Sequence, residues 1–327
     1  MATATAAYNA TRRGITAKIQ KEMNAVKLIY PMISDVRRST SKDEEYLLPG
    51  STPGVKKWIG DRDFKRLTSA TVEVSNDPWE SSIQIDRFNY DDDRLGLYSN
   101  SLSELAQEAM AHKDELCCEF LLKGETAECW DGQNFFDTTH AWRDSGTQSN
   151  IVELDVVDAA NPTPVEMKKA FRMAVRRIKS FKKDNGKRYY RSQVDRLSNF
   201  VCWTPMDLQT PLDEAFDQKL QLEIRGSASA ATTNVTYEKP KVVGVNLINS
   251  DDSYDGVSGS DSHFYVFYTG SVWKPLVFQP RSEIKTQIKG LTGSDIEFKD
   301  IKIMTEGRYN FGYLAWMYAI KVKLATA

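Results

Sequence analysis

Apolar residues recur at helical spacing in the first third of the chain. The longest such run covers residues 101–122, where Ser101 and Glu104 have the spacing of a capping box and Gly124 follows as a stop signal. A helix of this length would measure about 30 Å at about 1.5 Å per residue. The pattern therefore predicts a rod-like helix there and a shorter amphipathic helix over residues 11–25.

A second strong helical pattern spans residues 164–183. Thr163 is the expected N-cap, Pro164 the first helical residue, and Glu166 completes a capping box. The outer face of this helix is basic and includes Lys168, Lys169, Arg172, Arg176, Arg177 and Lys179. We interpret this face either as a contact for DNA or a partner protein, or as an ordinary solvated helix face.

Alternation of apolar and polar residues marks two strands between the first two helical patterns. Residues 71–74 and 82–86 alternate with period two, and residues 75–79 between them have the composition of a turn. We predict a long β-hairpin. Because it carries few apolar residues and an isolated hairpin is marginal in water, we expect another subunit to stabilise it. The alternative is an ordinary surface hairpin.

The second half of the chain mixes short strands with polar loops. Strands are predicted at residues 199–203, 241–247, 264–268, 295–304 and 309–323, with loops at 226–233 and 249–262. A turn is expected near Glu306 and Gly307.

Charge and composition narrow the class of protein. Lys and Arg total 43 and Asp and Glu 45, for a formal net charge of -2. A protein that condenses DNA normally carries a basic excess, so DNA contact is expected to be weak and non-specific. A near-zero net charge permits dense association between copies. We find no signal peptide or membrane-spanning stretch and expect a cytoplasmic protein.

The residues do not form a pattern typical of an enzyme or metal site. There is no phosphate-binding glycine loop and no nucleophile elbow. Cys129, Asp131, Asp137 and His140 are the nearest approach to a metal cluster, but they lack zinc-type spacing. The acidic run at 91–93 lacks the alternate ligands of a calcium loop. We predict no catalytic residue, metal or cofactor, and we interpret the adjacent Cys117 and Cys118 as packing residues.

Three stretches resemble the major head subunit family of Mu-like phages. They are Trp58-Ile59-Gly60-Asp61-Arg62, the run from Asp91 to Tyr98, and Asp131 to Phe136 followed by His140. The resemblance is specific between about residues 44 and 150. It implies the Hong Kong 97-type capsid fold, which is an α+β fold. The implied parts are an N-terminal arm (1–48), an extended loop (49–92), a peripheral domain with a spine helix (93–196), an axial domain (197–280) and a return to the peripheral sheet (281–327).

The resemblance also implies a function without catalysis. The chain is expected to be the major capsid protein of a tailed bacteriophage, assembling as hexamers and pentamers into an icosahedral shell around double-stranded DNA. Expected partners are copies of itself, a separate scaffolding protein, a portal and a decoration protein. Assembly is expected in the bacterial cytoplasm, with the product in the virion. Residues expected at the subunit interface of the extended loop are Trp58, Arg62, Phe64, Trp79 and Arg87.

Two rival functions and one rival packing remain open at this level. An encapsulin-like compartment would share the fold, but its gene would lie beside that of a cargo enzyme. A hydrolase or metal enzyme would need a cleft with perturbed ionisable groups. The aromatic residues Trp58, Phe64 and Trp79 are interface anchors in the first interpretation. In the alternative, they fold back onto their own chain.

Overall fold

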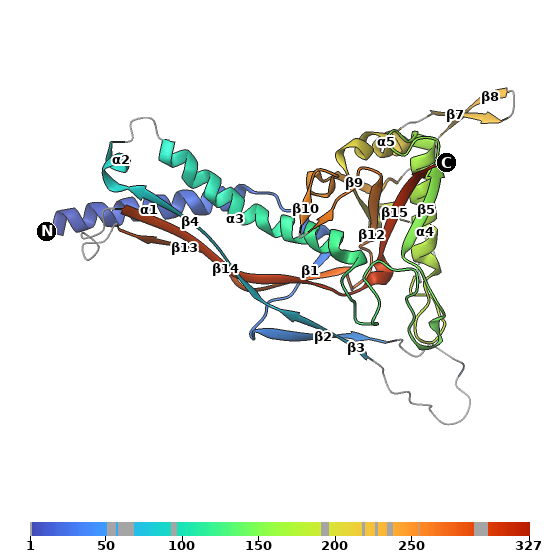
Figure 1. Ribbon diagram of the computed structural model, residues 1–327, viewed down its shortest axis with the longest axis horizontal. Helices are drawn as coiled ribbons and strands as arrows, with labels where there is room; N and C mark the ends of the chain where they lie inside the picture. Colours follow the sequence, from blue (N-terminus) through green and yellow to red (C-terminus); the bar gives the residue numbers. More distant parts are fainter. Residues whose placement is uncertain are drawn as a thin grey trace.

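The chain forms an elongated part joined to a rounder lobe (Figure 1). The computed structural model describes residues 2–50, 57, 69–92, 97–190, 196–217, 220–225, 228–233, 238–254, 256–290 and 300–327. The elongated part holds the N-terminal helix, the longest helix and the longest strands, and the lobe holds the C-terminus (Figure 1).

A four-stranded sheet with strand order β1-β13-β14-β4 forms the elongated part. Its strands are β1 (Ser34–Val36), β4 (Asp77–Asp86), β13 (Leu276–Lys289) and β14 (Asp300–Tyr313). Helices α1 (Ala2–Ala25) and α3 (Leu97–Leu122) lie along it, and the short helix α2 (Arg87–Asp91) follows β4. A small core closes this part, made by Ile15, Ile19, Met23, Ile85, Leu102, Leu105, Ala106, Ile301 and Ile303.

A five-stranded mixed sheet with strand order β5-β15-β12-β6-β9 forms the lobe. Its strands are β5 (Ile151–Val156), β6 (Phe200–Thr204), β9 (Lys241–Gly244), β12 (His263–Tyr268) and β15 (Ala319–Thr326). Helices α4 (Pro164–Ser180) and α5 (Met206–Asp217) pack against it and against each other. β6 and β12 are almost entirely buried because helices and loops cover both faces of the sheet.

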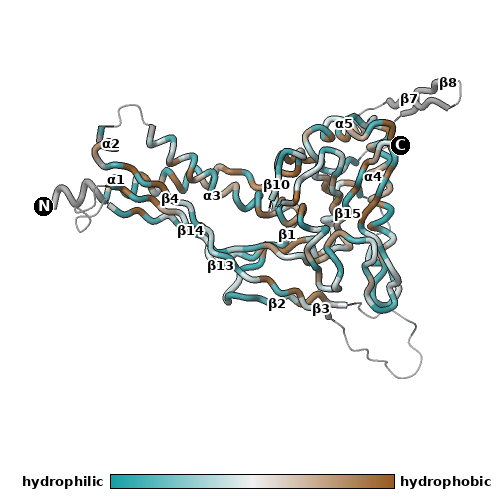
Figure 2. The backbone as a smooth tube through the Cα atoms, in the orientation of Figure 1, coloured by the Kyte–Doolittle hydropathy of each residue, from teal (hydrophilic) through white to brown (hydrophobic). Residues whose placement is uncertain are grey.

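Three two-stranded pairs complete the described structure. They are β2 (Asp43–Pro49) with β3 (Ser69–Ser75), β7 (Leu220–Arg225) with β8 (Ala228–Thr233), and β10 (Ser253–Tyr254) with β11 (Val257–Ser258). Short 3-10 helices lie at Tyr30–Met32, Lys123–Glu125, Arg143–Ser145, Leu197–Asn199, Asn246–Ile248 and Trp316–Tyr318. Hydrophobic stretches recur along α3 and through the lobe, whereas β2 is largely hydrophilic (Figure 2).

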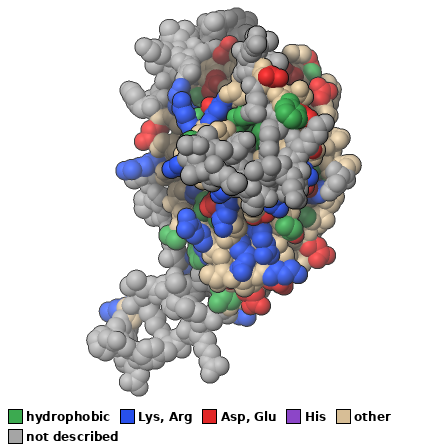
Figure 3. Space-filling view, turned by 90° about the vertical axis from the view of Figure 1, so that its left-hand side faces the viewer, with side chains coloured by type: hydrophobic (Ala, Val, Ile, Leu, Met, Phe, Trp, Pro, Cys, Tyr) green, Lys and Arg blue, Asp and Glu red, His purple; other side chains and the backbone are tan. Residues whose placement is uncertain are grey.

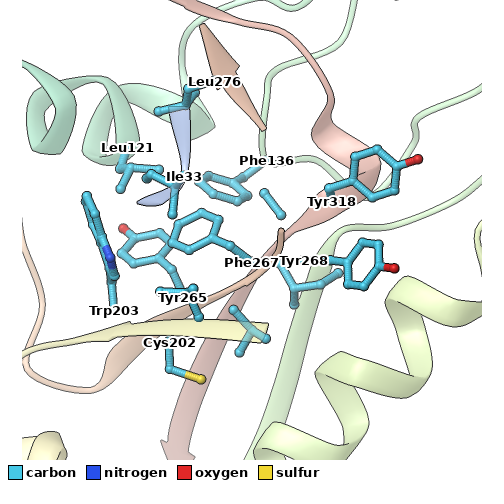
Figure 4. Close-up of a cluster of buried hydrophobic side chains, with 14 of the residues drawn as sticks. Ile33, Leu121, Phe136, Cys202, Trp203, Tyr265, Phe267, Tyr268, Leu276 and Tyr318 are labelled. Atoms are coloured by element: carbon cyan, nitrogen blue, oxygen red, sulfur yellow. The ribbon is translucent and has the colours of Figure 1, made fainter. Parts of the chain in front are cut away.

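The two parts share one continuous core at their junction. Leu121 of α3, Ile33 and Leu276 meet Phe136 and the lobe residues Trp203, Tyr265 and Phe267 there (Figure 4). All seven side chains are at most 2% exposed. Because this core is shared, we expect the long helix and the lobe to unfold together rather than as separate domains.

All three predicted helices are present, but two of them begin earlier than predicted. α1 begins at Ala2, nine residues before the predicted start at residue 11. α4 begins at Pro164 with the predicted reciprocal Thr163–Glu166 capping box. α3 begins at Leu97, four residues before the predicted cap. Ser101 and Glu104 therefore lie inside the helix, and the capping box predicted there is wrong. Spacing alone cannot distinguish a cap from the same residues one turn further on.

The predicted hairpin of residues 71–86 is also wrong. Both strands exist, but β3 pairs with β2, and β4 pairs with β14. Between them, the buried Asn76 donates from Nδ2 to the backbone oxygens of Ser41 and Lys42 at 3.1 and 3.0 Å. These bonds turn the chain out of one sheet into another. Period-two alternation identifies a strand but not its partner.

The turn predicted near Glu306 and Gly307 is absent, because β14 runs through both residues. A Cβ on Gly307 would lie 2.9 Å from Cε1 of Tyr309 and 3.2 Å from Cγ1 of Ile284. The glycine therefore makes room for neighbouring side chains within a strand. The predicted 226–233 loop contains β8, and helix α5 and strand β13 were not predicted.

The predicted domain ranges differ from the ranges of the two sheets. Strand β15, placed in the peripheral sheet with the rest of 281–327, belongs to the lobe. Helix α4, placed in the peripheral range 93–196, packs against lobe strands β5, β12 and β15. Residues 43–49, placed in the arm, form the partner strand of β3. The ranges differ because the chain crosses from the four-stranded sheet to the lobe between β14 and β15.

Candidate subunit-interface and partner-binding surfaces

The segment that follows α1, here called the arm, is fixed to the long helix α3 by a carboxylate. Asp114 accepts hydrogen bonds from the backbone N–H groups of Ile29 at 3.0 Å and Tyr30 at 2.8 Å. The Tyr30 ring packs against Phe278 with ring centroids 4.5 Å apart. These bonds satisfy N–H groups at the start of a 3-10 helix. They hold the arm close to the four-stranded sheet.

The β2–β3 pair is attached to the sheet through a buried polar chain. The hydroxyl of Tyr46 donates to Oε1 of Gln279 at 2.6 Å, and Nε2 of Gln279 donates to the backbone oxygen of Val74 at 3.1 Å. Gln279 is fully buried. Because an unpaired buried amide is costly, these two bonds fix the angle at which the pair leaves the body.

Two apolar side chains near this pair are exposed. Leu47 on β2 is 59% exposed, and Val36 on β1 of the four-stranded sheet is 49% exposed. The predicted interface residues Trp58, Arg62 and Phe64 lie between β2 and β3 in the sequence, outside the described residues. The side chain of Arg87 also lies outside them. The sequence prediction for these four residues stays a prediction.

Trp79 packs within its own chain. Its ring lies beside His112 and Tyr309, with centroid distances of 4.5 and 6.2 Å. Its Nε1 donates to the backbone oxygen of Tyr309 at 2.9 Å, and the Tyr309 hydroxyl lies 2.9 Å from Nδ1 of His112. The ring therefore links β4 to β14 and α3, as the alternative interpretation described.

The basic face of α4 is smaller than predicted. Lys168 is only 5% exposed and packs inward, whereas Lys169, Arg172, Arg176 and Arg177 are exposed. Lys179 is partly buried, with its Nζ 5.5 Å from the centroid of the Tyr190 ring. Arg172, Arg176 and Lys179 border an open cavity of about 970 Å³.

The charged residues of the surface are mixed in sign. Figure 3 views the molecule from the end at which α1 lies. Lys and Arg side chains gather in the lower half of this face, with Asp and Glu side chains beside them (Figure 3). This mixture is consistent with the net charge of -2. The described side chains on this face therefore form no extended single-sign field that would attract DNA.

The residues weighed as a metal cluster have structural contacts instead. His140 donates from Nδ1 to Oδ2 of Asp131 at 2.7 Å, and its ring stacks on Trp316 with centroids 4.0 Å apart. Asp137 accepts hydrogen bonds from Thr139. Among the described residues, no group of three or more His, Cys, Asp and Glu side chains is placed to hold a metal ion. No described helix is long and apolar enough to cross a membrane.

A partly buried ion cluster links the lobe sheet to the 3-10 helix that follows α3. Glu125 lies 2.7 Å from Nζ of Lys321 and 2.5 Å from Nζ of Lys323. His263 pairs with Lys323 across the β12–β15 ladder. Burial, the largest cause, acts with the charges of Lys321 and Lys323 to lower the pKa of His263 to about 4, while Glu125 opposes them.

This cluster predicts acid sensitivity of the lobe. The folded-state pKa of His263 lies below its ordinary value of 6.5, so the unfolded chain binds the proton more readily. The stability contributed by neutral His263 is therefore present above about pH 6.5 and is lost as the pH falls towards about 4. We expect His263→Gln to show a smaller loss of stability between pH 7 and pH 5 than the wild type, measured by urea unfolding. Equal losses in both proteins would show that other groups cause the effect.

Comparison with solved structures identifies the fold. The fold is similar to a capsid subunit of Cyanophage P-SCSP1u, with a TM-score of 0.59 and 11% identity, covering 92% of this chain and 89% of that one. It is also similar to the subunit of the bacteriophage JBD30 procapsid, with a TM-score of 0.53 and 19% identity, covering 98% and 76% of the two chains. The chain has the Hong Kong 97-type phage capsid fold, which confirms the α+β prediction.

Sequence comparison then finds a family that matches part of the chain. Residues 8–164 match the family described as Mu-like prophage major head subunit gpT. The chain is 37% identical over 111 residues to the Mu-like prophage FluMu major head subunit of Haemophilus influenzae. It is 34% identical over 133 residues to the major capsid protein of Escherichia phage Mu. These alignments cover 34% and 38% of this chain, but only 36% and 44% of the relatives' lengths.

The sequence did not reveal the residues that position the β2–β3 pair or those that α5 contributes to the cavity beside α4. Gln279 lies in a strand that was not predicted, and it meets Tyr46 across 233 positions of the chain. Phe216, which lines the α4 cavity, belongs to the unpredicted helix α5. α5 contains Pro211, which weakens its helical pattern. The local signal available for this helix was a short run of apolar residues at helical spacing: Leu208, Leu212, Ala215 and Phe216.

Proposed function

We propose that this chain is the major capsid protein of a tailed bacteriophage. Copies assemble as hexamers and pentamers into an icosahedral shell that encloses double-stranded DNA. The observation that carries the proposal is the family match of residues 8–164 on a chain whose whole fold is that of a phage capsid subunit. The same match favours a phage head over an encapsulin-like compartment, which the fold alone does not separate.

The shape supports a division into capsid parts. We assign α1 and the segment that follows it, as far as residues 29–30, as the N-terminal arm. These two residues donate backbone hydrogen bonds to Asp114. The β2–β3 pair with its tip is the extended loop, and the four-stranded sheet with α3 is the peripheral domain. The lobe with its five-stranded sheet is the axial domain, which meets other copies around a symmetry axis.

The extended loop is the part expected to depend most on a second copy. In the described residues, β2 and β3 form only a two-stranded sheet, with Leu47 exposed on β2. Two strands alone are marginal in water. A neighbouring subunit would supply the missing cover, and Trp58, Arg62 and Phe64, which lie between β2 and β3 in the sequence, are the residues proposed to anchor it.

The role proposed for the chain is structural rather than catalytic. The perturbed groups in the described part of the chain are mainly buried tyrosines and cysteines whose pKa burial raises, such as Tyr46 and Cys129. They are dispersed through the core rather than gathered in a cleft, which does not resemble an active site. We further propose a separate scaffolding protein, a portal and a decoration protein as partners. Assembly would take place in the bacterial cytoplasm, and DNA contact would be weak and non-specific.

Electron microscopy of the purified chain, alone and expressed with its neighbouring genes, tests this proposal. Rings of five or six subunits or closed shells are expected. Strictly monomeric or dimeric particles under both conditions would contradict it. Uniform shells from the chain alone would remove the separate scaffolding protein from the proposal. A neighbouring cargo-enzyme gene in place of terminase and portal genes would favour the compartment.

Two tryptophans separate folding from assembly. Trp79→Ala should lower the free energy of unfolding by roughly 1–3 kcal/mol, because its ring packs inside its own chain. Trp58→Ala should leave stability nearly unchanged but reduce the yield of shells, because its ring is proposed to bury between subunits. Urea unfolding and electron microscopy measure the two effects. The reverse result, with Trp58 controlling folding and Trp79 assembly, would exchange the two roles.

A further inference from the structure

The cavity beside α4 combines a cationic rim with an apolar floor. It has a volume of about 970 Å³ and lies between α4, α5 and the segment that follows α4. Arg172, Arg176, Lys179 and Arg188 contribute its positive charges, and Glu238 is the one carboxylate among its described lining residues. Such a volume lies at the upper end of the roughly 300–1,000 Å³ of ligand pockets. It can accept several side chains of a partner.

Three of the four cations on the rim have no ion-pair partner in the described part of the structure. They are Arg172, Arg176 and Arg188. Glu238 instead accepts a hydrogen bond from Ser198 at 3.4 Å. Exposed guanidinium groups are readily available for bidentate bonds to carboxylates. The rim therefore carries an excess of positive charge that an acidic partner would balance.

The floor is formed by apolar side chains from two helices. Phe171 of α4 and Phe216 of α5 pack edge to face with ring centroids 5.0 Å apart. Val175 and Leu197 also line the cavity. The rim positions 172, 176 and 179 follow helical spacing along one side of α4, over about 10 Å at about 1.5 Å per residue. A partner that matches this surface needs acidic groups in a line, next to an apolar stripe.

We propose that this cavity binds an acidic amphipathic helix of a separate protein that assists shell assembly. The inference rests on the proposed function, because that function supplies the partner's role in shell assembly. The charge of the rim selects carboxylates, and the apolar floor, of which Phe171 and Phe216 expose only 1% and 7%, favours aliphatic side chains beside them. A helix with acidic residues at positions i, i+4 and i+7 would match the spacing of Arg172, Arg176 and Lys179.

DNA fits the same surface less well. The phosphates of a duplex lie on a convex cylinder, whereas this surface is hollow. Single-stranded nucleic acid is usually held by bases that stack on exposed aromatic rings. Here the floor rings of Phe171 and Phe216 are only 1% and 7% exposed and already pack on each other. The net charge of -2 also opposes non-specific attraction to phosphates.

Fluorescence anisotropy with three labelled probes tests the proposal. The first probe is a synthetic amphipathic peptide of about 18 residues, long enough to form a helix, with Glu at i, i+4 and i+7 beside a Leu stripe. The second has Gln in place of every Glu, and the third is a short DNA duplex. The full chain is compared with Arg172→Glu/Arg176→Glu. The matched control is Lys169→Glu/Arg177→Glu, which reverses two exposed charges of α4 that do not line the cavity.

The wild type is expected to bind the Glu peptide at least about tenfold more tightly than the Gln peptide. Arg172→Glu/Arg176→Glu should lose about tenfold or more in affinity, while the control pair keeps nearly wild-type affinity. Glu is as good a helix former as Arg, so α4 should persist in both variants. Equal losses in the two variants, tighter binding of the duplex, or no saturable binding of the Glu peptide would each overturn the proposal.

Electron microscopy of the same preparations separates this inference from the proposed function. If the chain and both variants form rings or shells but the Glu peptide does not bind, the cavity proposal fails alone. If none of the preparations forms rings or shells, with or without neighbouring gene products, the proposed function fails. Peptide binding by a chain that never assembles would support the cavity as a binding site but remove its assembly role.

Discussion

Replacing Trp316 by alanine is expected to lower the free energy of unfolding by about 3–5 kcal/mol. The side chain is 1% exposed. Its ring stacks on His140 with an interplanar angle of 8° and meets the edge of Phe181 with centroids 5.2 Å apart. Trp316 begins the 3-10 helix that carries the chain from the four-stranded sheet into the lobe. Its loss would leave a cavity where both parts of the molecule meet.

Urea unfolding followed by circular dichroism measures this effect. Phe88→Ala is the matched control, because Phe88 is a large aromatic residue that is 69% exposed. We expect it to change the free energy of unfolding by no more than about 0.5 kcal/mol. A Trp316→Ala variant as stable as the control would show that the lobe and the four-stranded sheet do not depend on this junction.

Local physical signals accounted for the elements that the sequence predicted correctly. The Thr163–Glu166 capping box places two hydrogen-bonding groups within one helical turn. The start of α4 can therefore be predicted from residues that are close in the sequence. The long apolar stripe of α3 survives an error of four residues at its start, because the stripe extends over many turns. The family resemblance added the fold, which no local pattern specified.

Long-range pairing accounts for what the sequence could not predict. The alternation of β3 and β4 is equally compatible with pairing to each other or to strands elsewhere in the chain. The structure selects β2 and β14, and Asn76 fixes the change of direction by bonds to residues 41 and 42. Gly307 was interpreted as a turn residue, yet it is needed for contact with Ile284 and Tyr309. Neither fact is visible within a short window.

The candidate sites divide in the same way. The basic residues of α4 were visible from helical spacing, but the inward position of Lys168 and the apolar floor contributed by α5 were not. Trp79 was proposed as an interface anchor because it is a large aromatic residue in the predicted turn of a hairpin with few apolar residues. Its contacts with His112 and Tyr309 come from elements 33 and 230 positions away, taking the difference between the residue numbers.

Gly312 is expected to control how the extended loop leaves the body. It lies in β14 opposite Val277 of β13. A Cβ at this position would overlap Cγ2 of Val74 and lie 3.2 Å from Cγ1 of Val277. β3 can therefore approach the sheet closely only if residue 312 is glycine. Gly312→Ala should destabilise the chain by about 1–3 kcal/mol, the usual cost of overpacking a filled site.

Removing the opposing methyl groups should relieve this cost. Val74→Ala alone loses apolar burial, because Val74 is only 3% exposed. In the Gly312→Ala/Val74→Ala double variant, however, the added Cβ has space. The two substitutions should therefore be less damaging together than the sum of their separate effects, with a coupling of roughly 0.5–3 kcal/mol. Urea unfolding of the four proteins of this cycle measures the coupling.

The same cycle tests whether the loop angle matters for assembly. Gly312→Ala displaces β3 at the point where Gln279 holds the backbone of Val74. If a neighbouring subunit must receive the loop at a fixed angle, this variant should form fewer regular shells at a temperature where it remains folded. The double variant should recover them, since its β3 can return to the sheet. Regular shells from Gly312→Ala, together with additive unfolding energies, would mean that the close approach of Gly312 and Val74 determines neither the stability nor the loop angle.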